Sequence, residues 1–201
     1  MNSTGSHFAD KAAAQRAVDM ALPMIEPAMR APGVCGSGFL VIVVMDPALQ
    51  PGDCPFDDAV LVEHALDGGP GKPEKKPAVT RLLRLGTGEL AVPSAQHPTS
   101  RYALVLCSPH TGRYRQIRRH LKHLHHHLVG DSSHGDGRHN RAFRMLGVHR
   151  MLLHAWRLRF AHPLHGGMVD VVAPPDAEFR RALDLLGLAL PDPAEPSLLA
   201  A

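Results

Sequence analysis

The segment from Thr111 to Asp136, TGRYRQIRRHLKHLHHHLVGDSSHGD, concentrates side chains that could do chemistry. Its arginines carry fork-shaped cations that suit carboxylates and phosphates. His123 and His127 are four residues apart, a spacing that could chelate zinc or nickel on a helix. The residue types therefore allow three interpretations of this segment: the wall of an active site, an RNA-binding surface, or a metal site.

Charge favours a polyanion as the partner of this region. The formal net charge of the chain is only +3, but arginines crowd the stretch between residues 113 and 159. A local basic block suits a nucleic acid better than an uncharged small molecule. A solvated basic face remains the alternative interpretation of the same pattern.

The metal interpretation lacks a complete set of ligands. No carboxylate or cysteine stands at a matching distance from His123 and His127, so we expect surface histidines and no functional metal. Cys35, Cys54 and Cys107 are widely separated, which predicts neither a disulfide framework nor a cysteine zinc site. Such cysteine usage fits a reducing cytoplasm, where we expect the protein to be located.

Length and hydropathy predict a folded chain without membrane spans. The 201 residues, 44% of them apolar, can build one sizeable domain with its own core. The longest apolar run, residues 39–45, is far shorter than the ~20 residues of a membrane helix. The first residues lack a basic start followed by an apolar core, so no secretory signal is expected.

Periodicity gives a coarse order of elements. Strands are predicted at residues 39–44, at 78–85 and 89–93 as a pair across Gly86 to Gly88, and at 100–109. Residues 64–77 read as an exposed loop rich in glycine, proline and lysine. Ile117, Leu121, Leu124 and Leu128 form one face of a helix over residues 112–128.

The last third of the chain reads as further core elements. Residues 149–163 are a strand-like segment in which His154 is interpreted as structural. Residues 166–175 contain a strand whose Met168, Val169, Val171 and Val172 are expected in the core. An amphipathic helix follows and ends at Gly187, and the proline-rich tail from residue 189 is expected to be loose.

Four segments in this order carry a family resemblance: KPAVTRLLRL, PTSRYALVLCSPHTGRYRQIRRHLKHL, LVGDSSHGDGRHNR and RMLLHAWRLRFAHP. They resemble the RluA-type pseudouridine synthases, and within these the tRNA pseudouridine synthase C branch. The resemblance implies an α+β fold, a mixed and mostly antiparallel sheet with flanking helices, incomplete at its N-terminus. It also implies three parts: a poorly matching segment 1–38, a catalytic portion 39–188, and a flexible tail 189–201.

The resemblance implies an enzyme that isomerises a uridine in RNA, with tRNA as the expected RNA, without a cofactor and as a monomer. Arg118 matches the arginine that such enzymes set against a catalytic aspartate. Phe39 stands where they place an aromatic ring on the target base. The family's H-R-L-D-[RK] motif is absent, and HFADK offers Asp10 as the catalytic candidate.

Other positions of the arginine-rich segment are expected to support this chemistry. Contact with RNA is expected of five residues: Arg113, Arg115, Gln116, Arg119 and Lys122. Gly130 is expected to serve a turn, and Asp131 and Asp136 to cap or brace. Because the aspartate motif is degenerate, one alternative is a relative that binds RNA without converting it. A histidine-rich metal-binding protein and a basic interaction module unrelated to catalysis are the others.

Overall fold

The computed structural model describes residues 36–45, 59–94, 97–162, 164, 166–195 and 198. Contacts divide the chain into two compact units. The larger contains Ser37–Arg157 and Val172–Ala200, and the second contains Leu158–Val171. Asp10 lies outside the described residues, as does nearly all of the N-terminal segment 1–38, so the predicted division into three parts stays a prediction.

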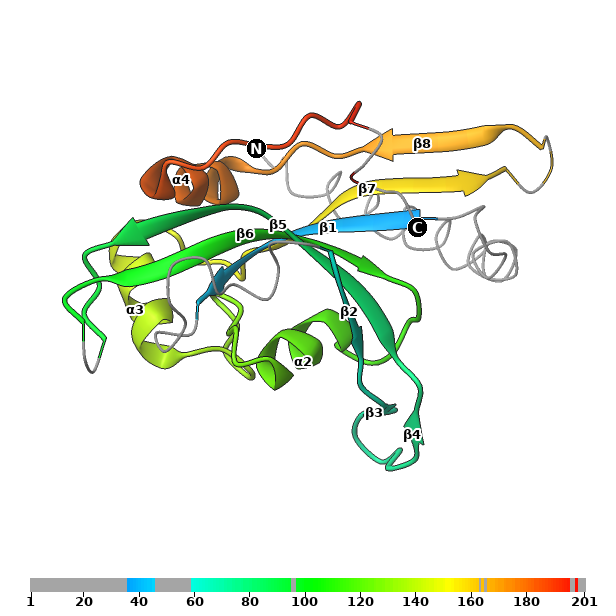
Figure 1. Cartoon of the computed structure of the whole chain (residues 1–201), viewed down its shortest axis with the longest axis horizontal. Helices are drawn as coiled ribbons and strands as arrows, with labels where there is room; N and C mark the ends of the chain where they lie inside the picture. The colour runs from blue at the N-terminus through cyan, green and yellow to red at the C-terminus, as the bar shows by residue number, and fades with distance from the viewer. Residues whose placement is uncertain are drawn as a thin grey trace, which may run out of the picture. The chain divides into compact units, whose positions relative to one another are not determined.

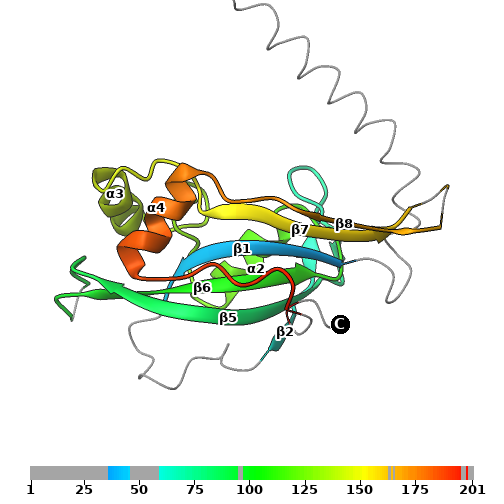
Figure 2. The same ribbon diagram turned by 90° about the horizontal axis from the view of Figure 1, so that it is seen from above.

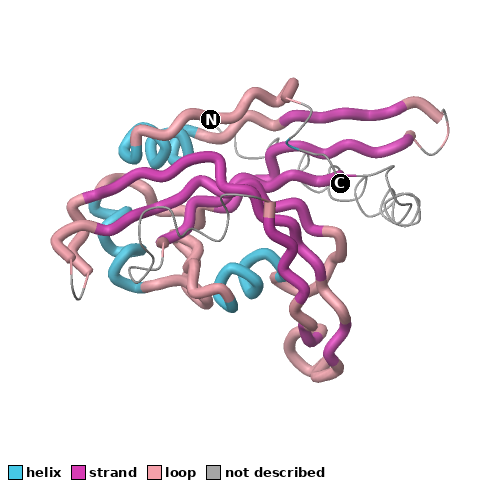
Figure 3. Tube along the Cα trace, viewed as in Figure 1, coloured by secondary structure: helices cyan, strands magenta, loops and turns pink. Residues whose placement is uncertain are grey.

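A six-stranded sheet organises the fold, in the order β2-β5-β6-β1-β7-β8 (Figures 1 and 3). Neighbouring strands run antiparallel in the pairs β1 with β6, β5 with β6, and β2 with β5. The strands are β1 (Gly36–Val44), β2 (Val60–Glu63), β5 (Val79–Leu90), β6 (Ser100–Pro109), β7 (Leu153–Ala161) and β8 (Met168–Val172). A separate two-stranded hairpin contains β3 (Leu66–Asp67) and β4 (Lys75–Lys76).

The helices α2 (Gln116–His123) and α4 (Ala177–Leu186) cover opposite faces of this sheet (Figures 1 and 2). Alternation along β1 supplies both faces, because successive side chains of a strand point to opposite sides. Leu40 and Ile42 belong to the apolar cluster that includes α4, and Val41 and Val43 to the cluster that includes α2. A third helix, α3 (Gly137–Met145), adds Phe143 to the α4 cluster.

The predicted hairpin across Gly86 to Gly88 is wrong. Residues 79–90 form one strand of 12 residues, β5, which pairs with β6 along its length and has an irregularity between Arg84 and Gly86. The glycines serve close packing instead of a turn. A Cβ on Gly88 would lie 2.3 Å from the carbonyl oxygen of Leu186, and one on Gly86 2.9 Å from the Leu188 side chain.

The predicted helix over residues 112–128 is shorter than expected. α2 ends at His123, and His125 adopts a left-handed backbone with φ of 61°. Leu128 then forms an isolated antiparallel bridge with Val43 of β1. The apolar stripe is nevertheless buried at Ile117, Leu121 and Leu128, because the chain after the helix returns to the same face of the sheet.

The strand β8 does not bury its apolar side chains as predicted. Met168, Val171 and Val172 are exposed and Val169 is half-buried, so the assignment of these residues to the core is wrong. The prediction of an amphipathic helix ended by Gly187 is confirmed: α4 has Asp176 as its N-cap and Gly187, with φ of 63°, as its C-cap.

The C-terminal tail, expected to be loose, has a fixed point where it is described. Leu198 is buried in the α4 cluster, and its carbonyl oxygen accepts a hydrogen bond from Arg81 Nη1 at 3.4 Å. The α+β arrangement itself matches the prediction. Among the described residues, no helix has the length and apolar character needed to cross a membrane.

Candidate active site and RNA-binding surface

The loop before α2 is held in place by one buried amide, that of Gln116. Its Oε1 accepts hydrogen bonds from Thr111 Oγ1 at 2.8 Å and from Arg113 N at 3.0 Å. Its Nε2 donates to Val79 O and to Thr80 Oγ1, both at 2.9 Å. Gln116 therefore ties the loop to β5 with both ends of its amide in use, and its predicted contact with RNA stays untested.

Arg115 precedes the helix in a strained backbone conformation. Its φ of 51° and ψ of 35° lie in the left-handed region, which a residue other than glycine seldom adopts. Its guanidinium carbon lies 4.9 Å from the centroid of the Tyr114 ring, within the range of a cation–π interaction. Both side chains are exposed, so a cation and an aromatic ring face solvent together at the start of α2.

A buried ion pair fixes Arg118, the arginine that the resemblance sets in the cleft. Arg118 Nε donates to Asp131 Oδ2 at 2.6 Å, and Nη2 donates to Asp131 Oδ1 at 2.7 Å. The Asp131 side chain is 0% exposed and that of Arg118 16%. This two-bond geometry fixes the plane of the guanidinium and leaves its third nitrogen, Nη1, uncommitted within the described residues.

Electrostatics keep Asp131 ionised. Burial by itself raises the pKa of this carboxyl, but hydrogen bonds from Arg118 and from the backbone N–H groups of His134 and Ser133 outweigh it. The pKa falls to about 2. The same hydrogen bond to Asp131 raises the pKa of Arg118, so both members of the pair are charged near neutral pH.

The turn that carries Asp131 is connected to α3. Gly130, with φ of 81°, donates from its N–H to Asn140 Oδ1 at 2.6 Å, and Asn140 Nδ2 donates to Asp131 O at 2.9 Å. A Cβ on Gly130 would lie 2.2 Å from Arg150 O, so this position requires glycine. Asp136 is the N-cap of α3. The predicted turn at Gly130 and the bracing parts of both aspartates are confirmed.

Arg119 connects α2 to the β3–β4 hairpin. Its Nη2 donates to Asp67 Oδ2 at 2.6 Å, and its Nη1 donates to Asp67 O at 3.0 Å. The Asp67 carboxylate also accepts from Gly69 N at 2.9 Å, and these contacts lower its pKa. Arg119 is thus engaged within the protein, whereas the Lys122 side chain is exposed and has no partner among the described residues.

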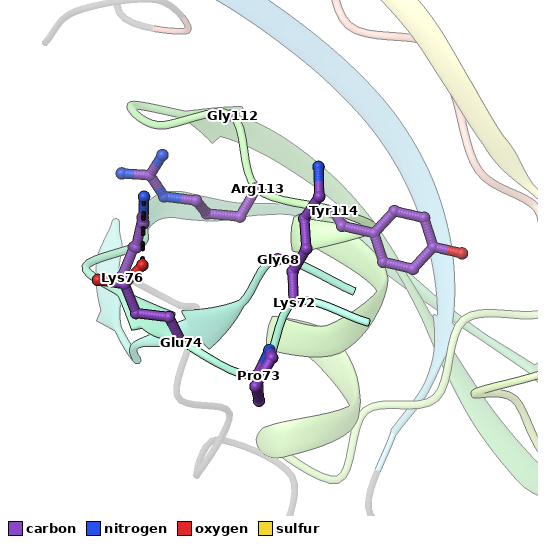
Figure 4. Close-up of a pocket in the computed structure, with 8 residues that line it drawn as sticks. All are labelled: Gly68, Lys72, Pro73, Glu74, Lys76, Gly112, Arg113 and Tyr114. Carbon is purple, nitrogen blue, oxygen red and sulfur yellow. Dashed lines mark ion pairs between the residues drawn. The ribbon is translucent and has the colours of Figure 1, made fainter. Parts of the chain in front are cut away.

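An open hollow of about 440 Å³ lies where this hairpin meets the loop before α2 (Figure 4). Lys72, Lys76 and Arg113 supply three cations to its lining. Glu74 forms an ion pair with one of them, because its Oε2 lies 3.6 Å from Lys76 Nζ. Arg113 Nε also donates to Pro77 O at 3.0 Å. The hollow therefore has a net positive lining, suited to an anionic group.

The histidines do not form the pair suggested by their spacing. His123 is the last residue of α2 and His127 lies beyond it, with its Nδ1 donating to His134 O at 2.9 Å. His123 instead stacks on His64, with ring centroids 3.8 Å apart. Across the described part of the chain, no three histidine, cysteine, aspartate or glutamate side chains are placed to hold a metal.

Phe39 lies in β1 opposite Cys107 of β6, and its half-buried side chain packs against the apolar cluster that includes α2. Phe39 and Arg118 therefore belong to the same side of the sheet. The pairing of Arg118 with Asp131 was not predicted, because no local pattern relates residues 13 positions apart across a turn.

Known proteins resemble this chain. The tRNA pseudouridine synthase C of Salmonella typhimurium is 46% identical over 113 residues, which are 56% of this chain and 44% of the relative. That of Vibrio parahaemolyticus is 50% identical over 91 residues, or 45% of this chain and 37% of the relative. The chain spans less than half the length of these relatives. No protein-family model matches it.

Two solved structures resemble its fold. Human RNA pseudouridylate synthase domain containing 1 superposes with a TM-score of 0.55 and 26% identity, over 79% of this chain and 60% of that one. Human RNA pseudouridylate synthase domain containing 4 superposes with a TM-score of 0.57 and 20% identity, over 87% and 70%. The predicted fold is confirmed: this chain has the fold of pseudouridylate synthase domains.

Proposed function

We propose that this chain is part of an RNA pseudouridine synthase that converts a uridine in tRNA to pseudouridine. The similarity to tRNA pseudouridine synthases C carries the proposal. The reaction breaks the N-glycosidic bond of uridine, turns the base, and rejoins it through C5 with no net redox change. It therefore needs a carboxylate and a cleft that holds the base outside its stack, and no cofactor.

Arg118 has the geometry to orient such a carboxylate. Two of its nitrogens are held by Asp131, which fixes the guanidinium plane and directs the remaining Nη1. In this proposal Asp10 supplies that carboxylate as nucleophile or base, and Nη1 is the guanidinium nitrogen that remains to pair with it. Phe39, on the same side of the sheet as α2, packs its ring against the target base.

The RNA backbone is proposed to lie along the exposed cations around α2. Arg115 and Lys122 are free to meet phosphates, and Arg113 supplies a charge at the hollow beside the β3–β4 hairpin. Arg119 contributes mainly by holding that hairpin through Asp67. We further propose that the protein acts in the cytoplasm, because its separated cysteines suit a reducing compartment. Action as a monomer is proposed from the family resemblance alone.

Release of tritium from 5-tritiated uridine in bulk tRNA tests the activity. The unmutated protein should release tritium, and Asp10→Asn should abolish release because it removes the charge of the carboxylate while keeping its size. Arg118→Ala should cause much of the same loss. No release by the unmutated protein, together with retained RNA binding, would identify a relative that binds without catalysis.

Binding is tested separately with Arg115→Ala combined with Lys122→Ala, two exposed positions outside the buried network. Affinity for tRNA should fall, and the dependence of log affinity on log salt should flatten by about two, one unit for each lost phosphate contact. Treatment of the unmutated protein with EDTA should leave both activity and binding unchanged. Activity restored by added zinc would contradict the proposal of metal-free chemistry.

A further inference from the structure

A second set of arginines lies on α3, away from the loop and helix considered so far. Arg138, Arg141 and Arg144 are all exposed, spaced three residues apart on the outer side of the helix. We call them the α3 arginine face. The helix contains no acidic residue, so all the charged side chains that it exposes are positive.

Buried contacts fix which side of α3 faces outward. His139 Nδ1 and Tyr102 Oη are 2.8 Å apart, and Phe143 packs against the Tyr102 ring with centroids separated by 5.1 Å. Asn140 bonds to Gly130 N and Asp131 O. These three inner residues set the rotation of the helix about its axis, so the opposite arginines are held toward solvent.

The charges of this face are largely uncommitted. Arg138 Nη1 donates to Pro93 O at 3.1 Å. The side chains of Arg141 and Arg144 have no hydrogen bond or ion pair within the part of the chain that the structure describes. The nearby Asp136 carboxylate accepts from the N–H groups of Arg138 and His139 as the N-cap. Within the described residues, the side chains of Arg141 and Arg144 are therefore available to an anionic partner.

We propose that the α3 arginine face binds phosphates of the RNA backbone outside the target nucleotide. This inference rests on the proposed function. Guanidinium groups bind phosphate through two parallel hydrogen bonds, and three of them along about 9 Å of helix axis can meet more than one phosphate. The rings of α3, those of His139 and Phe143, are both buried, so the face offers no aromatic ring on which bases could stack. It should bind without regard to base sequence.

The face is also placed in a fixed relation to Arg118. Asn140 bonds to the turn that carries Asp131, and Asp131 holds the Arg118 guanidinium. RNA held at α3 is thereby set in register with the proposed cleft through the hydrogen bonds that Asn140 and Arg118 both make to Asp131. Binding by α3 would thus contribute to aiming the substrate as well as to its affinity.

The test is the salt dependence of affinity for a fluorescently labelled, unmodified tRNA transcript. Arg141→Ala combined with Arg144→Ala should weaken binding about tenfold at 0.15 M salt and reduce the slope of log affinity against log salt by about two. Single Arg141→Ala should lower the slope by about one. The matched control is Arg180→Ala, an exposed arginine of α4 with no side-chain partner among the described residues, which should leave the slope unchanged.

Each outcome decides the matter. A slope unchanged in the double variant, while Arg115→Ala with Lys122→Ala lowers it, overturns this inference and leaves the proposed function standing. An equal drop for Arg180→Ala indicates nonspecific attraction by net charge and also overturns it. Absence of RNA binding by the unmutated protein removes the proposed function and this inference together. Thermal unfolding of each variant separates lost contacts from lost folding.

Discussion

The helices α2 and α4 cover opposite faces of one sheet, yet they are held by different interactions. α4 buries Phe179, Ala182, Leu183 and Leu186, all of them apolar. The buried residues of α2 alternate in character: Gln116 and His120 are polar, and Ile117 and Leu121 are apolar. His120 uses Nε2 to donate to His64 O at 3.1 Å, while its Nδ1 has no partner.

The two helices therefore have different structural roles: α4 stabilises the sheet, and α2 orients the Arg118 side chain. Apolar contact is non-directional, so the α4 face can stabilise the sheet through buried area alone. Hydrogen bonds are directional, and leaving one buried partner unmet is costly. On the α2 face, buried polar contacts orient Arg118 and the loop before α2, and loss of one partner there is therefore costly. Substitutions on the α4 face should therefore affect stability alone, and those on the α2 face both stability and RNA chemistry.

The largest expected effect is that of Phe179→Ala on the α4 face. The ring is fully buried, so its removal should lower the free energy of unfolding by about 3–5 kcal/mol. Affinity for tRNA should persist wherever the variant remains folded. Chemical denaturation and tRNA titration on the same preparation measure both, with Met145→Ala, at a position 84% exposed, as the control. Loss of affinity for tRNA in folded Phe179→Ala would contradict the expectation that substitutions on the α4 face affect stability alone.

Asp131→Ala should have the next largest effect, on the α2 side. It leaves the guanidinium of Arg118 without its partner, at a cost of about 3 kcal/mol, the low end for buried pairs because Arg118 is partly exposed. Any tritium release should fall with it, because Nη1 is no longer aimed. Asp131→Asn keeps the side-chain size and an acceptor for the backbone N–H groups, so it should recover part of the stability but little turnover. Full turnover in Asp131→Asn would exclude an aiming part for the charge.

The ion pair between Arg118 and Asp131 should also make the stability of the protein depend on pH in acid. The pKa of Asp131 in the folded protein, about 2, lies below the value near 3.8 expected when unfolded. Its contribution is therefore complete above about pH 5 and is lost as the pH falls toward 2, an amount of about 2 kcal/mol. Stability measured from pH 6 to pH 2 should drop less steeply in Asp131→Asn than in the unmutated protein. Parallel curves would show that other carboxyls dominate acid unfolding.

The smallest expected effect comes from Gln116→Ala. It removes four hydrogen bonds, but water can reach part of the loop, so the expected loss of stability is about 1–2 kcal/mol. Affinity for tRNA should fall as well, because Arg113 and Arg115 lie in this loop and lose their fixed positions with it. Gln116→Glu keeps the acceptor and loses the donors to β5, and an intermediate result is expected. Unchanged affinity in both variants would mean that the loop needs no bracing.

Local patterns predicted the elements that are determined by residues close together in the sequence. The apolar runs of β1 and β6 and the glycine after α4 all describe structure within a few residues. The pattern at β5 wrongly predicts a turn because glycine is a common turn former, whereas Gly86 and Gly88 are explained by the close approach of Leu188 and Leu186. Val171 and Val172 of β8 likewise follow a strand pattern, yet both are exposed, because a strand pattern does not say whether another element covers the strand.

The sequence predicted which residues belong to the site but not which ion pairs they form. Composition and resemblance selected Arg118, but its pairing with Asp131, and that of Arg119 with Asp67, depend on folds of the chain over 13 and 52 residues. In the sequence, the exposed arginines of α3 belong to the same basic block as those of α2. Only the burial of His139, Asn140 and Phe143 separates the two surfaces.

The position of β1 in the sheet has a consequence for how this protein is made. β1 is central and lies beside β6, with Phe39 opposite Cys107, so a ribosome must add almost seventy further residues before this partner exists. Until then the run from Leu40 to Val44, which is fully or almost fully buried in the finished fold, is an unpaired apolar strand. Such segments attach readily to other nascent chains. Association between unfinished chains is therefore expected to involve β1, an element that the finished fold buries.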